Sequence, residues 1–121
     1  MNNVINWFEI PVAEMDRAVA FYEPVMQVAL RREKMDCIEM AVFPHEDPAS
    51  GGALAKFEGV KPSDQGCIIY LHTDNLAATL DRVNSAGGSC VFGPLELADD
   101  IGTIALFIDS EGNRIGLHQP A

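Results

Sequence analysis

The first half of the chain shows a strand pattern, then a helix pattern, then three more strand patterns. Residues 4–12 are rich in β-branched and aromatic side chains and reach a turn at Pro11, which predicts a strand. Hydrophobic residues then recur at helical spacing from residue 14 onward, which predicts an amphipathic helix. Because Pro24 lacks the backbone N–H that a helix uses, we expect the helix to end or kink near Tyr22 or Glu23. Extended segments are predicted at residues 28–34, 37–43 and 52–57, with a loop at 44–52.

The same succession of patterns begins again after a polar segment at residues 60–66. Residues 67–73 predict a strand. Asp74 or Asn75 is placed to cap a second amphipathic helix, which we expect to end at Gly87 and Gly88. Strands are then predicted at residues 89–92, 103–108 and 114–118, with a tight turn at 110–113.

A fixed offset of 61 residues relates the two halves. It pairs Val12 with Thr73, Met15 with Leu76, Val19 with Leu80 and Tyr22 with Val83, and three of these four pairs are hydrophobic on both sides. The element order also matches, so the sequence predicts a duplicated module. Half a chain of about 60 residues buries too little surface to be stable alone. We therefore expect the halves to share a core with each other or with a second chain.

Length and charge narrow the classes of function. The 121 residues, 48% of them hydrophobic and 21% charged, predict one folded domain over 1–121, with module one at about 1–60 and module two at about 66–121. The formal net charge of -10 disfavours binding to nucleic acid or to an anionic membrane surface. No hydrophobic run approaches the roughly 20 residues of a membrane span.

The cysteines favour a reducing compartment. Cys37, Cys67 and Cys90 are odd in number, lie far apart and form no CxxC pair, which argues against a disulfide framework or a structural zinc site. Each lies in or beside a hydrophobic stretch, so we expect buried thiols. The start of the chain does not have the pattern of a signal peptide, and a cytoplasmic location is predicted. The six phenylalanines are spread one to an element and are interpreted as core residues.

Three segments resemble the vicinal oxygen chelate superfamily of glyoxalases, bleomycin resistance proteins and extradiol dioxygenases. They are NWFEIPVAEMDRAVAFYEPVM (6–26), YLHTDNLAATLDRVNSAGGSCVFGP (70–94) and IALFIDSEGNRIGLHQP (104–120). The closing DSEGNRIGL (109–117) is similar to the usual DPDGNxIEL ending of the family. The resemblance implies an α+β fold of two βαβββ modules, whose strands form an open, curled, barrel-like sheet around a pocket. It also implies a homodimer and a small-molecule ligand.

The resemblance further implies a divalent metal, but the positions that would hold it carry no ligands. In this sequence they are Trp7 in the first strand, Leu54 or Ala55 in the fourth, Ile68 in the fifth and Gly116 in the last, where family members with metal have an acid. None of these side chains is a metal ligand. We therefore predict no cofactor at the usual positions, with a divalent metal as the alternative.

Alternation along the strands predicts which side chains face the pocket. If the family's parity holds, Trp7 and Glu9 point inward from the first strand and Tyr70 and His72 from the fifth. Gly116 and His118 point inward from the last strand. The result is a hydrophobic pocket with a few polar groups. Trp7 either stacks on a planar ligand or, as we favour, packs the barrel as a buried side chain.

Glu9 is the candidate catalytic residue. It is either a general base in the pocket or a carboxylate that pairs with an arginine (Arg31, Arg32 or Arg114) or reaches solvent. His45 lies in a polar loop and is interpreted as solvated. Glu9, His72 and His118 form the alternative metal set, because two histidines and a glutamate are a known set of divalent-metal ligands.

Two main functional hypotheses follow. The first is a protein that binds or sequesters an apolar or planar compound without the usual metal. The second is a divalent-metal-dependent lyase, isomerase or dioxygenase of the glyoxalase type. A weaker third is a metal-independent enzyme with Glu9 as its base. The fold alone does not decide among them.

Overall fold

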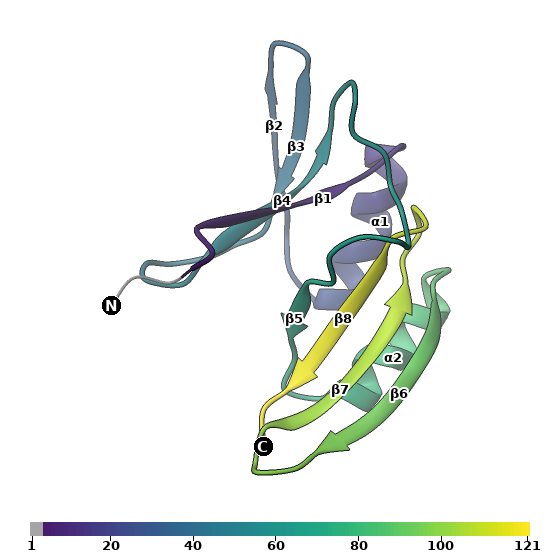
Figure 1. The fold of residues 1–121 in the computed structure, drawn as a ribbon. Coiled ribbons are helices and arrows are strands. Elements are labelled where there is room, and N and C mark those ends of the chain that lie inside the picture. The colour runs from purple at the N-terminus through teal and green to yellow at the C-terminus, as the bar shows by residue number, and fades with distance from the viewer. Residues whose placement is uncertain (1–3) are drawn as a thin grey trace.

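The computed structural model describes residues 4–121 and contains two similar modules, each a four-stranded sheet with one helix (Figure 1). The first module consists of β1 (Trp7–Pro11), α1 (Met15–Met26), β2 (Arg31–Met35), β3 (Ile38–Val42) and β4 (Gly51–Lys56). The second consists of β5 (Tyr70–His72), α2 (Leu76–Ser85), β6 (Ser89–Leu97), β7 (Gly102–Ile108) and β8 (Arg114–Gln119). This is the predicted α+β fold of two βαβββ modules.

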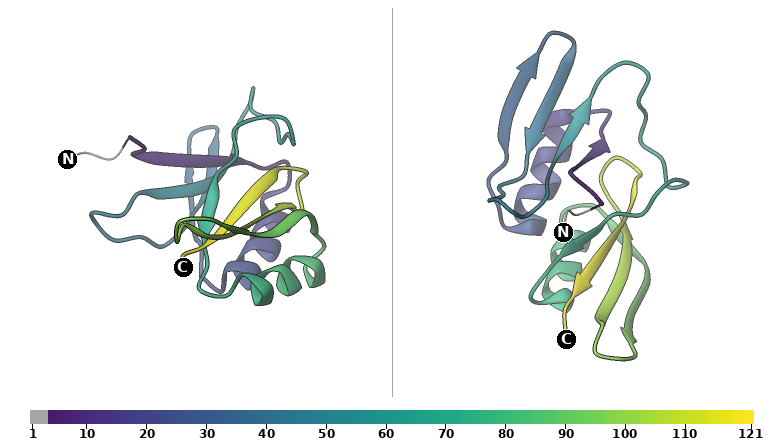
Figure 2. Two further views of the ribbon diagram at one scale, coloured as in Figure 1. Left: turned by 60° about the horizontal axis from the view of Figure 1, so that its bottom comes forward. Right: turned by 60° about the vertical axis from the view of Figure 1, so that its left-hand side comes forward.

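The two sheets have the same topology. Their strand orders are β1-β4-β3-β2 and β5-β8-β7-β6, and in each sheet the first and last strands are parallel neighbours. The remaining neighbours are antiparallel. Within residues 4–121 no strand of one sheet pairs with a strand of the other, so both sheets stay open (Figure 2). A single chain therefore forms two open halves rather than a closed barrel.

α1 continues past the position where we expected it to end. The helix runs to Met26 with Pro24 inside it, and Gln27 takes a left-handed conformation just after it. Pro24 is exposed and lies in the last turn, so the helix loses one backbone hydrogen bond there. The next residue, Val25, is fully buried. We infer that the burial of Val25 outweighs the lost bond and holds the last turn in place.

β6 also differs from its prediction, because it extends to Leu97 instead of ending at Phe92. Its pairing with β7 shifts register on both sides of Phe92, next to Gly93 and Pro94. Gly93 has a φ of 85°, a conformation that favours glycine, and the missing N–H of Pro94 is tolerated at a bulge of an edge strand. The Gly-Pro pair therefore makes an irregularity in the strand and does not end it.

Each helix packs on one face of its own sheet, and the two helices also contact each other. The core contains alternate residues of the strands together with the buried sides of α1 and α2. Its largest fully buried side chains include Tyr22, Phe21, Phe107, Ile10, Leu54 and Leu117. The interpretation of all six phenylalanines as core was wrong for Phe92, which is 46% exposed on the other face of its sheet, and for half-buried Phe57, which lies outside the core.

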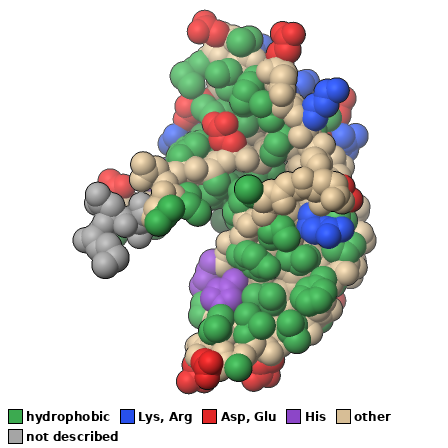
Figure 3. All heavy atoms as spheres, viewed as in Figure 1, with side chains coloured by type: hydrophobic (Ala, Val, Ile, Leu, Met, Phe, Trp, Pro, Cys, Tyr) green, Lys and Arg blue, Asp and Glu red, His purple; other side chains and the backbone are tan. Residues whose placement is uncertain are grey.

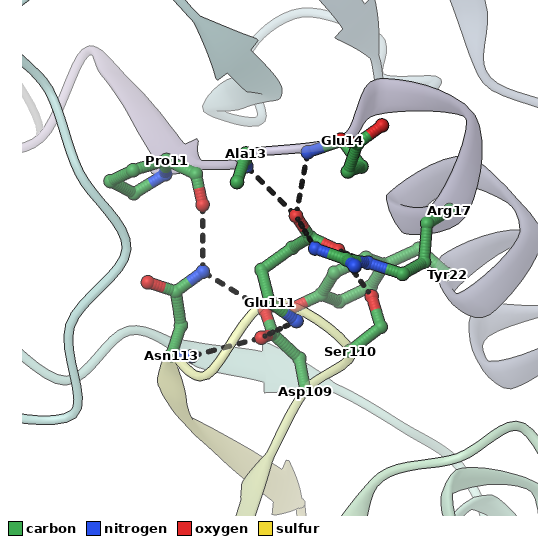
Figure 4. A network of polar contacts seen from close by, with 9 residues as sticks. All are labelled: Pro11, Ala13, Glu14, Arg17, Tyr22, Asp109, Ser110, Glu111 and Asn113. Atoms are coloured by element: carbon green, nitrogen blue, oxygen red, sulfur yellow. Dashed lines mark hydrogen bonds and ion pairs between the residues drawn. The ribbon is translucent and has the colours of Figure 1, made fainter.

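The turn between β7 and β8 joins the two modules by docking on the start of α1 (Figure 4). The side chain of Glu111 has no exposed surface, and its carboxylate accepts hydrogen bonds from the backbone N–H groups of Ala13 (2.8 Å) and Glu14 (2.9 Å) and from Arg17 (2.7 Å). Burial alone would raise the pKa of Glu111, but these hydrogen bonds outweigh it and lower the pKa to about 2. Glu111 thus acts as an anionic cap for α1 across the module boundary.

A second set of bonds lies beside this cap (Figure 4). The hydroxyl of Tyr22 donates a buried hydrogen bond of 2.5 Å to Asp109, and the amide of Asn113 donates to the carbonyl of Pro11 at 2.7 Å. Asp109 also accepts hydrogen bonds from the backbone N–H groups of Glu111 and Asn113. Burial, together with the negative charge of Asp109, raises the pKa of Tyr22 well above 10. The polar residues of the closing motif therefore hold the two modules together.

Two further expectations concern the surface. The prediction of buried thiols was wrong, because Cys37 and Cys67 are exposed and Cys90 is only half-buried. Cys90 packs against the edge of the core, whereas the hydrophobic neighbours of Cys37 and Cys67 did not bring those two thiols into it. In the part of the chain that the structure describes, neither helix is long and hydrophobic enough to cross a membrane.

Candidate functional site

Each sheet has one face that no helix covers, and the candidate site residues lie on these two faces. On the second sheet, side chains of the uncovered face alternate with the buried ones that pack on α2. The space-filling view shows a hydrophobic surface with a histidine at its edge over the lower lobe, where this sheet lies, and a hollow between that lobe and the upper one (Figure 3). The residues of this face are Tyr70, His72, Phe92, Leu95, Ile104, Leu106, Ile108, Arg114, Gly116 and His118.

The register of β5 and β8 brings together four of the predicted residues in two pairs. Tyr70 lies beside Gly116, and His72 lies beside His118. Gly116 is buried beneath the tyrosine, because a Cβ at this position would lie 2.5 Å from Cδ1 of Tyr70. Gly116 thus leaves room for the ring of Tyr70. The resemblance implies a metal-ligating acid at the position of this glycine in family members that hold a metal.

Trp7 and Glu9 share the uncovered face of the first sheet. Trp7 is 41% exposed, so the interpretation of it as a buried packing residue was wrong. Its indole packs edge-on against the ring of His45, with 5.9 Å between the centroids. His45 is exposed, as expected, but its ring also lies over Gly51, where a Cβ would come within 2.5 Å of it. Trp7 and His45 thus form a small aromatic platform at one end of the sheet.

Glu9 is exposed and accepts one hydrogen bond, from the indole Nε1 of Trp7 at 3.3 Å. Two of the three arginines considered as its partners are engaged elsewhere. Arg31 pairs with Glu33, and Arg32 pairs with both Asp16 and Glu39. The carboxylate is therefore available on the uncovered face, and its role as a base stays a prediction.

The two candidate histidines already have partners. Nε2 of His72 lies 3.0 Å from a carboxylate oxygen of Asp74, and Nε2 of His118 lies 2.6 Å from the carbonyl oxygen of Ile101. Glu9 belongs to the other sheet, and within residues 4–121 no three His, Cys, Asp or Glu side chains gather closely enough to hold a metal ion.

The positions that the resemblance assigns to a metal also fail on chemical grounds. Trp7 and Ile68 are partly exposed, Leu54 and Ala55 are buried, and Tyr70 lies over Gly116. Tryptophan, leucine, alanine, isoleucine and glycine at the assigned positions offer no side-chain atom that binds a divalent cation. The residues of this chain therefore do not fit the family's metal site.

A cavity of about 270 Å³ lies where the two modules meet, between the end of β1 and the start of β8. Glu9 and Arg114 line it together with Lys61 and the hydrophobic side chains of Ile69 and Ile115. Arg114 was predicted only as a possible partner for Glu9, although its position two residues before Gly116 places it on the same face of the strand. A larger hollow of about 560 Å³ near Lys34 and Lys56 contains none of the predicted site residues.

The fold and sequence are similar to those of several known proteins. A "Glyoxylase-like domain-containing protein" of Didymella fabae is 26% identical over 123 residues, which cover 93% of this chain and 91% of that protein. TnmS3, an antibiotic binding protein from Streptomyces sp. CB03234, superposes with a TM-score of 0.75 at 23% identity, over 98% of this chain and 97% of that one.

A mutant of glyoxalase I from Zea mays superposes with a TM-score of 0.70 at 19% identity, over 93% of this chain and 44% of that one. The family model matches residues 4–117, which is nearly the whole chain. This protein therefore belongs to the Glyoxalase/Bleomycin resistance protein/Dioxygenase superfamily.

Proposed function

We propose that this protein binds a small apolar or planar compound over the uncovered faces of its sheets, without the divalent metal of the family's enzymes. One observation carries the proposal. At the position where family members with metal have an acid, Gly116 supports the ring of Tyr70, which is 46% exposed. An aromatic ring held in this way can stack on a planar or apolar surface, and Gly116 itself offers no side-chain atom to a metal.

Further side chains support binding as the function. Trp7 is 41% exposed, and hydrophobic residues such as Ile104 and Leu106 are only half-buried on their uncovered face. A hydrophobic surface of this kind gains free energy when a ligand or a second protein surface removes it from water. A solved antibiotic binding protein of the same fold is consistent with a binding role.

A second copy of the chain completes the pocket in this proposal. Both sheets are open, and each has one face with a helix and one face without. Placing the sheets of two chains face to face would enclose a pocket and bury exposed residues such as Phe92 and Leu95. The bound form is therefore a homodimer.

A fluorescence titration tests the proposal, because Trp7 is the single tryptophan and lies on the uncovered face. An uncharged planar aromatic such as anthraquinone is added to protein purified without a metal-affinity tag, with and without chelator. We expect saturable quenching that chelator does not change. Tyr70→Ala should weaken binding at least tenfold, whereas Tyr70→Phe, which keeps the ring, should leave it near the wild-type value.

The metal-dependent alternative has one observation in its favour, because His72 and His118 are neighbours on the uncovered face. If this pair and Glu9 hold an ion across two chains, elemental analysis should find about one divalent ion per pocket, and Glu9→Gln should remove it. That result would replace binding alone with a lyase, isomerase or dioxygenase reaction. Absence of saturable quenching, or quenching that needs metal, would contradict the proposal above.

A further inference from the structure

Arg114 is the arginine of the described chain whose side chain has neither an ion pair nor a hydrogen bond. Arg17, Arg31 and Arg32 form ion pairs with carboxylates, and Arg82 donates hydrogen bonds to Thr79 and to the carbonyl of Val25. The side chain of Arg114 makes no hydrogen bond or ion pair with residues 4–121, and its Nε is buried without a partner. An unpaired buried donor on a charged group costs free energy, so its presence calls for a partner from outside the chain.

The side chain of Arg114 lies at the cavity of about 270 Å³ between the modules. Arg114 is one of the residues that line this cavity, and its terminal nitrogens, unlike its Nε, are not buried. The walls are largely hydrophobic, formed by Ile10, Pro11, Ile69 and Ile115. The charged groups of the lining are Arg114, Lys61 and Glu9, which leaves a single net positive charge in a chain whose overall charge is -10.

We propose that this cavity binds the carboxylate of a small organic acid, with Arg114 as its counter-ion. The guanidinium matches a carboxylate with two parallel N–H donors, and the neighbouring hydrophobic walls take the carbon skeleton. The proposal rests on the proposed function and deepens it, because Arg114 shares a face with Tyr70 and Gly116. The ligand is then a compound with an acidic group at the module junction and an apolar body over the sheet.

The charges favour a carboxylate over a phosphate or phosphonate group. Glu9 lines the same cavity, and its negative charge repels a dianion more strongly than a monoanion. One arginine and one exposed lysine are also few cations for a dianionic group. A monocarboxylate therefore fits the cavity better.

Calorimetric titration of the wild-type protein with benzoate, benzamide and phenylphosphonate tests the assignment. We expect benzoate to bind with a dissociation constant below about 1 mM and at least tenfold more tightly than either of the others. Arg114→Gln should weaken benzoate binding at least tenfold and leave benzamide unchanged. Arg31→Gln removes the same charge from an exposed arginine that pairs with Glu33, so it should bind benzoate like the wild type.

Three results would overturn the proposal. The first is that benzoate does not bind, and the second is that benzoate and benzamide bind equally well. The third is that phenylphosphonate binds more tightly than benzoate. If Arg114→Gln does not fold, the comparison of acid with amide on the wild type decides the question by itself. Anthraquinone quenching of Trp7 is measured in parallel. Quenching without any preference for acids would overturn the carboxylate site alone, whereas loss of quenching would overturn the binding function.

Discussion

At the scale of single residues, Glu111 and Gly116 show how one closing motif serves both stability and the site. Glu111 points back toward the first module and caps α1 with its carboxylate. Gly116 lies five positions later on the uncovered face and leaves room for the ring of Tyr70. The first residue stabilises the contact between modules, and the second shapes the surface that we propose binds ligand.

The cap predicts a specific dependence of stability on pH. The carboxyl of Glu111 ionises near its ordinary value of 4.5 in the unfolded chain and at about 2 in the folded one. Its contribution to stability is therefore complete above pH 4.5 and is lost as the pH falls toward 2. This lowering of the pKa corresponds to roughly 3 kcal/mol, and because Arg17 is half exposed we expect Glu111→Gln to cost about 2 kcal/mol at pH 7.

Urea unfolding of the wild type and of Glu111→Gln between pH 2 and 7 measures this effect. The difference in unfolding free energy should shrink as the pH falls below 4.5. Glu33→Gln is the matched control, because Glu33 pairs with Arg31 on the surface, and it should change stability by less than about 0.5 kcal/mol. A constant difference across the whole pH range would mean that the charge of Glu111 does not stabilise the fold.

At the scale of elements, hydrophobic periodicity predicted most of the structure and was wrong where proline occurs. The Asn75 cap was among the two predicted, and its side chain accepts a hydrogen bond from the backbone N–H of Ala78. Pro24 was expected to end or kink its helix and β6 was expected to end at Phe92, yet α1 continues past Pro24 and β6 continues past Pro94. Local rules account for the lost donor of a proline but not for the buried neighbours that hold the backbone in place.

Pro24 therefore destabilises the last turn of α1, and the burial of Val25 compensates for this loss. We expect Pro24→Ala to stabilise the protein by about 1 to 2 kcal/mol, because it restores a helical hydrogen bond at an exposed position. Thermal and urea unfolding measure the change. Pro44→Ala in the exposed loop before β4 is the control and should be neutral or slightly destabilising. If Pro24→Ala is destabilising instead, the proline ring contributes packing that its exposure does not reveal.

At the scale of the whole molecule, the proposed function needs a second chain, because the two open sheets of one chain do not enclose a pocket between them. We expect sedimentation equilibrium at micromolar concentration to give about twice the 13.1 kDa of one chain. Phe92→Asp places a charge on the uncovered face of the second sheet and should shift the protein toward the monomer. Ile101→Asp changes an equally exposed turn residue and should remain dimeric. A monomer for the wild type would contradict the shared pocket.

The sequence by itself determined the two modules. The spacing of hydrophobic residues predicts each helix and strand, and the same order of elements occurs twice along the chain. It also determined which residues share a strand face, such as Tyr70 with His72, since alternation is a property of the backbone. Only the tertiary structure decided the contacts between modules. Three features depend on how segments that are distant in sequence pack together: the cap by Glu111, the ring of Tyr70 over Gly116 and the unpartnered side chain of Arg114. A local sequence pattern does not show which distant segments come into contact.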